Sequence, residues 1–200
     1  MKKFAVLAVF LGLVSGGAFA GDVEKGRAKA AVCGSCHGQD GNTTLQGDYP
    51  KLAGQNAKYI VQQLKDFKSK ARANDIMYGQ VTALSDEDME NIAAYYASLD
   101  VQYAAVPDEF IEMGQRLYRA GDKASGIPAC TACHGPQGNG LNAAGFAALG
   151  GQNPEYTIAQ LKAFRNGSRE NDPNRMMRDI SAKLTDEQMK ALAYYLVGLH

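Results

Sequence analysis

The sequence predicts an all-α fold made of two tandem copies of one unit. The main observation is an internal repeat, since Cys33 and His37 recur 97 residues later as Cys130 and His134. No stretch shows the sustained alternation of polar and apolar residues that is typical of strands. Two copies indicate a pair of domains, because a solenoid needs at least three repeats.

The repeat extends well beyond the cysteine motifs. Matching pairs at this offset include Gly38/Gly135, Asn42/Asn139, Gln55/Gln152, Asn56/Asn153, Tyr59/Tyr156 and Phe67/Phe164. Three extra residues at 173–175 then lengthen the offset to 100. The segment 100–107 follows the first copy and ends in a proline, so we expect a first domain over 21–103 and a second over 104–200.

Each half is expected to form three helices. In the first half they run from Asp22 to about Val32, from Ala57 to about Ser69 behind an Asn56 cap, and from Ser85 to near Leu99. Their counterparts begin near Asp108, at Asn153 with Pro154 following, and at Thr185, where Gln188 completes a capping box. The third helices carry apolar stripes, so we expect them to pack in a core.

The first twenty residues have the pattern of a secretory signal peptide. Lys2 and Lys3 precede an apolar run over residues 4–14, and a small-residue cleavage site ends at Ala20. The alternative is an uncleaved anchor, but the run is shorter than the ~20 residues that span a bilayer. We therefore expect cleavage before Gly21 and a periplasmic protein, with peripheral membrane association left open.

The charge balance excludes some partners. The full chain has 21 basic and 21 acidic residues, and removing residues 1–20 takes away only Lys2 and Lys3 among them. Without a basic patch or stripe, no nucleic-acid partner is expected.

The four cysteines lie in two C-x-x-C-H motifs, which are the attachment signature of haem c. A zinc site would place its cysteine pairs about 15–20 residues apart, and a thioredoxin-like pair would need a βαβ context. Disulfides would not require a histidine after each pair. We therefore expect two covalently bound haem c groups at Cys33, Cys36, Cys130 and Cys133, with His37 and His134 as axial iron ligands.

The second axial ligand of each iron is expected to be a methionine. His200 is the one remaining histidine, so two histidines at both irons are excluded within one chain. The thioether of methionine is a haem ligand that raises the reduction potential. In the first half, Met89 lies on the apolar stripe and is expected in the core. Met77 lies in the expected loop before the third helix and is the predicted ligand.

In the second half the candidates are Met176, Met177 and Met189. Met77 lies seven residues before Leu84, and Met177 lies seven before Leu184. This spacing favours Met177, whereas Met176 stays an alternative because the three-residue insertion directly precedes the pair.

Each ligating histidine is expected to donate its other ring N–H to a backbone carbonyl. The candidate carbonyls are those of residues 49–52 for His37 and 146–149 for His134. Pro50 has no counterpart in the second half, which predicts two haems of different potential.

The chain resembles the cytochrome c4 family, whose members carry two haems in two class I cytochrome c domains. The first arm is matched by GDVEKGRAKAAVCGSCHG, YPKLAGQNAKYIVQQLKDF and LSDEDMENIAAYYASL, and the second by GQRLYRAGDKASGIPACTACHGPQGNG and LGGQNPEYTIAQLKAFRNG. The resemblance implies a pseudo-twofold pair of domains with haem propionates near their interface. It also implies a periplasmic or membrane-associated electron carrier of bacterial respiration, often one that feeds a terminal oxidase.

These features favour an electron carrier that is not an enzyme. With histidine and methionine on opposite faces, an iron has no vacant position for a small-molecule substrate. The expected partners are a donor and an acceptor redox protein, such as a respiratory complex or a terminal oxidase. The alternatives are a cytochrome subunit of a dehydrogenase, for instance a flavin-dependent sulfide-oxidising complex, and a two-haem peroxidase or thiosulfate dehydrogenase with one open haem.

Overall fold

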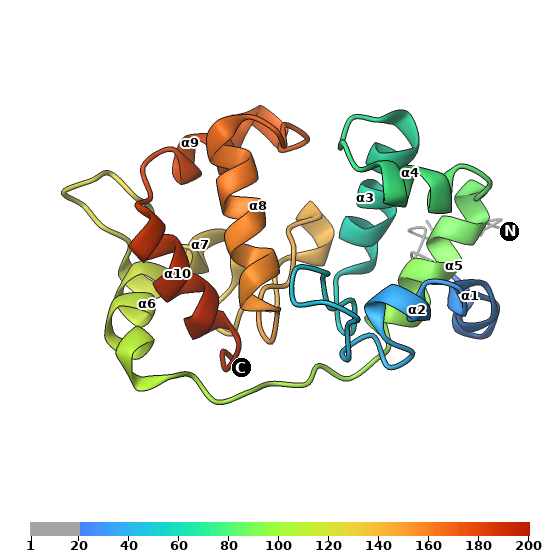
Figure 1. Ribbon diagram of the computed structural model, residues 1–200, viewed down its shortest axis with the longest axis horizontal. Coiled ribbons are helices and arrows are strands. Elements are labelled where there is room, and N and C mark those ends of the chain that lie inside the picture. The colour runs from blue at the N-terminus through green and yellow to red at the C-terminus, as the bar shows by residue number, and fades with distance from the viewer. Residues whose placement is uncertain (1–20) are drawn as a thin grey trace, which may run out of the picture.

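The computed structural model describes residues 21–200; the predicted signal peptide, residues 1–20, lies outside this part. The predicted all-α duplication is confirmed. Two groups of helices lie side by side, and the segment 98–107 connects them along one edge (Figure 1). The described residues contain no strand, only isolated bridges at Asp122/Ile127 and Leu141/Phe146. The predicted domain limits, 103 and 104, fall within the connecting segment and stay a prediction.

The helices of the first half are α1 (Val23–Ala30), α2 (Gly34–His37), α3 (Ala57–Ser69), α4 (Asp75–Val81) and α5 (Asp86–Ala97). Those of the second half are α6 (Asp108–Ala120), α7 (Thr131–His134), η1 (Asn142–Ala144), α8 (Pro154–Asn166), η2 (Pro173–Arg175), α9 (Met176–Ser181) and α10 (Asp186–Leu196). The expected three long helices per half are present, and short helices are added at the cysteine motifs and before the last helix.

The N-caps agree with the expected ones at some helices and differ at others. Thr185 and Gln188 form the predicted capping box, and Ser85 forms a second box with Asp88. The prediction of side-chain caps at Asn56 and Asn153 is wrong. Both occupy the N-cap position without capping their own helix, because their side chains bond to the other half instead.

The segment around Met77 also differs from the expected loop, because it forms the short helix α4. Asn74 begins this helix by accepting a hydrogen bond from the Met77 amide at 2.9 Å. In the second half the inserted residues form η2, and Asn174 and Arg175 take left-handed φ values of 52° and 60°. The helix α9 then starts directly at Met176.

Glycines bring the first and last helices of each half into close contact. A Cβ atom added to Gly26 of α1 would collide with the carbonyl group of Asn91 in α5. At Gly114 of α6, an added Cβ would lie 2.6 Å from the Ala191 carbonyl oxygen of α10. Side chains at these positions would push the helices apart, so the glycines allow the α1–α5 and α6–α10 pairs to form.

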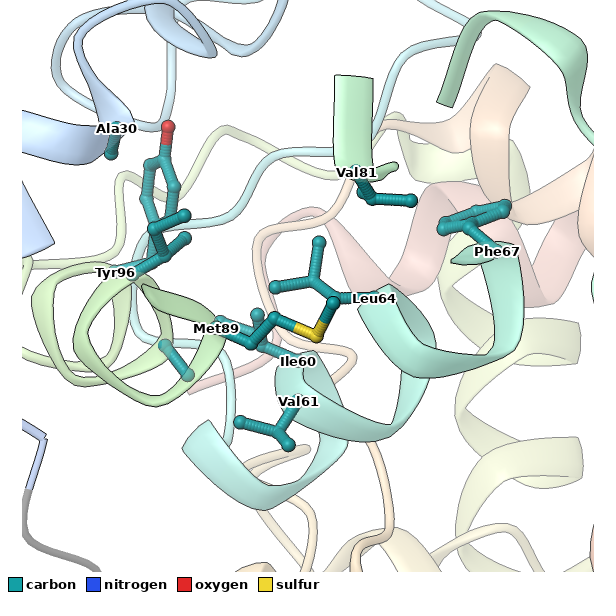
Figure 2. Close-up of a cluster of buried hydrophobic side chains, with 10 residues drawn as sticks. Ala30, Ile60, Val61, Leu64, Phe67, Val81, Met89 and Tyr96 are labelled. Atoms are coloured by element: carbon teal, nitrogen blue, oxygen red, sulfur yellow. The ribbon is translucent and has the colours of Figure 1, made fainter. Parts of the chain in front are cut away.

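The third long helix of each half supplies the core, as predicted. Met89 is completely buried, and Figure 2 shows its side chain directed from α5 toward Leu64 of α3. Met189 is equally buried in the second half. Among residues 21–200, every helix is too short or too polar to cross a bilayer.

Candidate functional site

A cavity of about 1480 Å³ is lined by residues of both halves. Both cysteine motifs reach it, through Cys33, Cys36 and His37 of the first half and Cys130, Cys133 and His134 of the second. Its apolar lining comes from α3, α5, α8 and α10 and includes Ile60, Leu64, Phe67, Ile92, Leu161, Phe164, Leu192 and Leu196. The predicted cysteine and histidine residues therefore line one largely apolar space, which suits a broad apolar ring system.

Each motif histidine is held by a backbone carbonyl. His37 Nδ1 lies 2.9 Å from the Pro50 oxygen, and His134 Nδ1 lies 2.8 Å from the Ala147 oxygen. Both carbonyls fall within the expected four-residue windows. A carbonyl can only accept, so Nδ1 must carry the proton and Nε2 is left with a free lone pair. This is the tautomer that an imidazole needs to bind iron through Nε2.

Burial shifts the pKa values of both motif histidines and of two of the cysteines. It lowers the pKa of His37 and of His134, because the charged imidazolium is poorly solvated in the cavity wall. It raises the pKa of the Cys33 thiol, and that of Cys130 to about 11. Before haem is attached, the imidazoles are therefore neutral at neutral pH and these two thiols are protonated; all four cysteines are free of disulfide bonds.

The methionines separate into two groups. Met77 lines the cavity from α4, whereas Met89 is buried in the helix core. In the second half Met176 and Met177 both line the cavity, on the first turn of α9. The geometry thus distinguishes Met77 from Met89 and keeps Met176 beside Met177.

Two arginines that the sequence analysis did not identify lie in the wall between the halves. Arg72 and Arg169 are related by the same 97-residue offset and are only 9% and 7% exposed. Arg72 donates to its own Gln63 at 2.9 Å, and across the boundary to Tyr156 at 3.0 Å and Gln160 at 2.8 Å.

Arg169 makes the mirrored set of bonds. It donates to its own Gln160 at 2.8 Å, and across the boundary to Tyr59 and Gln63, both at 3.0 Å. The amide oxygens of Gln63 and Gln160 therefore each accept from both Arg72 and Arg169. The recurrence of tyrosine and glutamine at matching positions of the second helices was the available sequence signal for this network.

The paired guanidiniums make this part of the cavity positively charged. Among residues 21–200, neither Arg72 nor Arg169 is within ion-pair distance of a carboxylate. Burial tends to raise the pKa of Tyr59, but the charges of Arg169 and Arg72 outweigh it and lower that pKa. Buried charges are normally paired, so the site fits a ligand that carries carboxylate groups, as haem does.

Comparisons with known proteins agree with this geometry. The family model for cytochrome c matches residues 23–100 and again 111–200. The chain is 44% identical to cytochrome c4 of Pseudomonas aeruginosa over the whole of both chains. It is 41% identical to a thiosulfate dehydrogenase electron acceptor of Stutzerimonas stutzeri, covering 85% of this chain and 80% of that one. The crystal structure of reduced cytochrome c4 from Pseudomonas stutzeri superposes with a TM-score of 0.86 at 43% identity, covering 90% of this chain and all of that one.

Proposed function

This chain belongs to the cytochrome c4 family of dihaem electron-transfer cytochromes, and we propose that it carries single electrons through a bacterial periplasmic respiratory chain towards a terminal oxidase. It holds two covalently bound haem c groups. The observation that carries the proposal is the cavity into which both C-x-x-C-H motifs open, since it brings the two haem sites together between the halves.

The roles of the individual residues are part of the proposal. Cys33 and Cys36 would anchor the first haem through thioether bonds, with His37 and Met77 as its axial ligands. The second haem would be anchored and ligated by Cys130, Cys133, His134 and Met177. When bound, each haem supplies an iron that gains or loses one electron. The buried cations Arg72 and Arg169 would balance the carboxylate groups of the haems.

This ligand set favours an electron carrier that is not an enzyme. With a histidine Nε2 and a methionine sulfur both bound, neither iron would keep an open position for a small molecule. Apolar side chains of α3 and α8 line the site. The chain then needs no general acid, base or nucleophile, because only electrons are exchanged with partner proteins.

The proposed location is the periplasm. The support comes from the sequence of residues 1–20, whose basic start, apolar run and cleavage pattern are those of a signal peptide. In that compartment, an oxidase or another acceptor would oxidise the protein and so complete the proposed electron-transfer path.

A second candidate concerns the electron donor. The similarity to a protein named as a thiosulfate dehydrogenase electron acceptor favours a thiosulfate dehydrogenase as the donor to this chain. Mixing the oxidised protein with such an enzyme and thiosulfate would give fast haem reduction under this hypothesis. A respiratory donor alone would leave the thiosulfate-dependent rate at background.

The first test is the visible spectrum of the reduced holoprotein with and without carbon monoxide. Carbon monoxide binds open ferrous positions, so the unaltered protein should not change. Met77→Ala and Met177→Ala should each leave one iron with an open position. In each variant carbon monoxide should then shift about half of the haem absorbance, and the reduction potential of one haem should fall. Met176→Ala is the matched control and should bind none.

Each other outcome has a clear meaning. Carbon monoxide binding by Met176→Ala and not by Met177→Ala would assign the ligand to Met176. Binding to half of the haem in the unaltered protein would contradict the carrier proposal and favour a two-haem enzyme with one open site.

A further inference from the structure

The loops that orient the two histidines are each held by the opposite half of the molecule. Pro50, whose carbonyl accepts from His37, lies between Tyr49 and Lys51. The amide oxygen of Gln152 accepts from the Lys51 N–H at 2.8 Å, and its amide nitrogen donates to the Lys51 carbonyl at 3.0 Å. The side chain of the next residue, Asn153, donates to the Tyr49 carbonyl at 2.7 Å.

The second half shows the same arrangement with the roles exchanged. Ala147, whose carbonyl accepts from His134, lies between Phe146 and Ala148. Gln55 accepts from the Ala148 N–H at 2.7 Å and donates to its carbonyl at 2.9 Å. Asn56 donates to the Phe146 carbonyl at 2.7 Å. In both loops the histidine-orienting carbonyl is thus flanked on each side by bonds from the other half.

Burial and missing helix caps indicate that these side chains are placed to bond across the boundary. Gln55 and Gln152 are only 7% and 8% exposed, so their amide groups need partners inside the protein. Asn56 and Asn153 sit where an asparagine normally caps its own helix, and neither does so. Helix capping is given up on both sides in favour of a bond across the boundary.

We propose that Gln55 and Asn56 position the histidine of the second half, while Gln152 and Asn153 position that of the first. They are positioning residues, which act on the iron through the Ala147 and Pro50 carbonyls. The proposal rests on the proposed roles of His37 and His134 as iron ligands. It makes each haem sensitive to the docking of the opposite half.

The expected direction follows from the chemistry of the imidazole. A firm bond from Nδ1–H to a carbonyl makes the ring a stronger electron donor, which stabilises oxidised iron. Releasing the loop weakens that bond, so the potential of the haem should rise and Nδ1–H should exchange faster with water. Removing such supporting partners shifts metal affinity about 10–100-fold. A loosened bond should shift the reduction equilibrium about threefold, which is about 30 mV at 59 mV per tenfold change.

Asn56→Ser and Asn153→Ser are the matched variants. Serine is a good N-cap, so helices α3 and α8 are retained, yet it is too short to reach the opposite loop. In the ¹⁵N-histidine-labelled holoprotein, an NMR redox titration follows the His37 and His134 rings separately and gives one potential for each haem. Asn56→Ser should raise the potential at His134 and speed its Nδ1–H exchange, leaving His37 unchanged; Asn153→Ser should do the reverse.

The crossed pattern distinguishes positioning from general destabilisation. If each variant alters the haem of its own half, alters both equally or alters neither, the proposal is wrong. Gln55→Leu and Gln152→Leu should repeat the crossed pattern and test it independently. Failure of the ligand assignment is recognised beforehand, because the His37 and His134 rings of the unaltered protein would then lack the large shifts of haem-bound imidazoles.

Discussion

Replacing the two buried arginines by leucine, singly and together, tests how the halves are joined. In Arg72→Leu the hydroxyl group of Tyr156 loses its donor, whereas Gln63 and Gln160 still accept from Arg169. Hydrogen bonds to charged groups contribute about 1.5–3 kcal/mol each. In Arg72→Leu two of the three acceptors stay bonded, so we expect a loss of about 2 kcal/mol of unfolding free energy. In Arg169→Leu both Tyr59 and Asn171 lose their donor, so the expected loss is about 3 kcal/mol.

The double variant should lose more than the sum of the single variants. With both donors gone, the amide oxygen of Gln160 has lost both arginine bonds, while Gln63 keeps a bond from Asn171 at 2.9 Å. An orphaned buried acceptor costs about 1–3 kcal/mol. Gln160 is only half-buried, so the lower end applies and the excess over the sum should be about 1 kcal/mol.

Equilibrium urea unfolding of the holoproteins, followed by haem absorbance and by far-ultraviolet circular dichroism, measures this coupling. Two like charges in one buried site also repel, and this repulsion gives an excess of the same sign, because either single variant already removes it. A zero or negative excess would therefore refute the shared-acceptor reasoning. Arg27→Leu is the control, since Arg27 is exposed on α1. Its effect on the free energy of unfolding should simply add to that of Arg72→Leu or of Arg169→Leu.

Two further predictions concern stability, both measured by the same urea unfolding. Ser181 is fully buried and its hydroxyl has no partner among the described residues, while the first half has Val81 at the matching position. Ser181→Val should therefore raise the free energy of unfolding by about 1 kcal/mol. An unchanged urea midpoint would show that the hydroxyl group of Ser181 has a hydrogen-bond partner. Gly26→Ala should destabilise by about 3 kcal/mol or more, because its Cβ would collide with the Asn91 backbone. Gly79→Ala, in open space, should be neutral or slightly stabilising, and similar losses in both glycine variants would contradict the packing argument.

The duplicated architecture and the long helices could be predicted because their signals are local. The second helix of the first half has the expected bounds, 57–69, since its amphipathic pattern and its boundaries lie within one short stretch. The short helix around Met77 was missed, because a few residues carry too little periodicity to distinguish a helix from a loop. Its start depends on one cap, Asn74.

The candidate site divides in the same way. The motif residues could be predicted because Cys33, Cys36 and His37 are adjacent in the chain and their spacing alone indicates the chemistry. Arg72 and Arg169 could not, because their partners lie on the opposite half, 84 to 110 residues away. These two arginines are buried by contacts between the halves, so their burial is seen only once the two domains are packed together.

The reciprocal contacts have a consequence for how the protein responds to dilution. Gln55, Asn56 and Arg72 each bond to the other half, and their repeat partners Gln152, Asn153 and Arg169 return these bonds. Such reciprocity is the property of a self-complementary dimer interface. Two separate domains would associate only at protein concentrations above their dissociation constant. Here the segment 98–107 tethers the two partners, and a short flexible tether provides an effective concentration in the millimolar range. The cavity therefore assembles to the same extent in one molecule alone as in a concentrated solution.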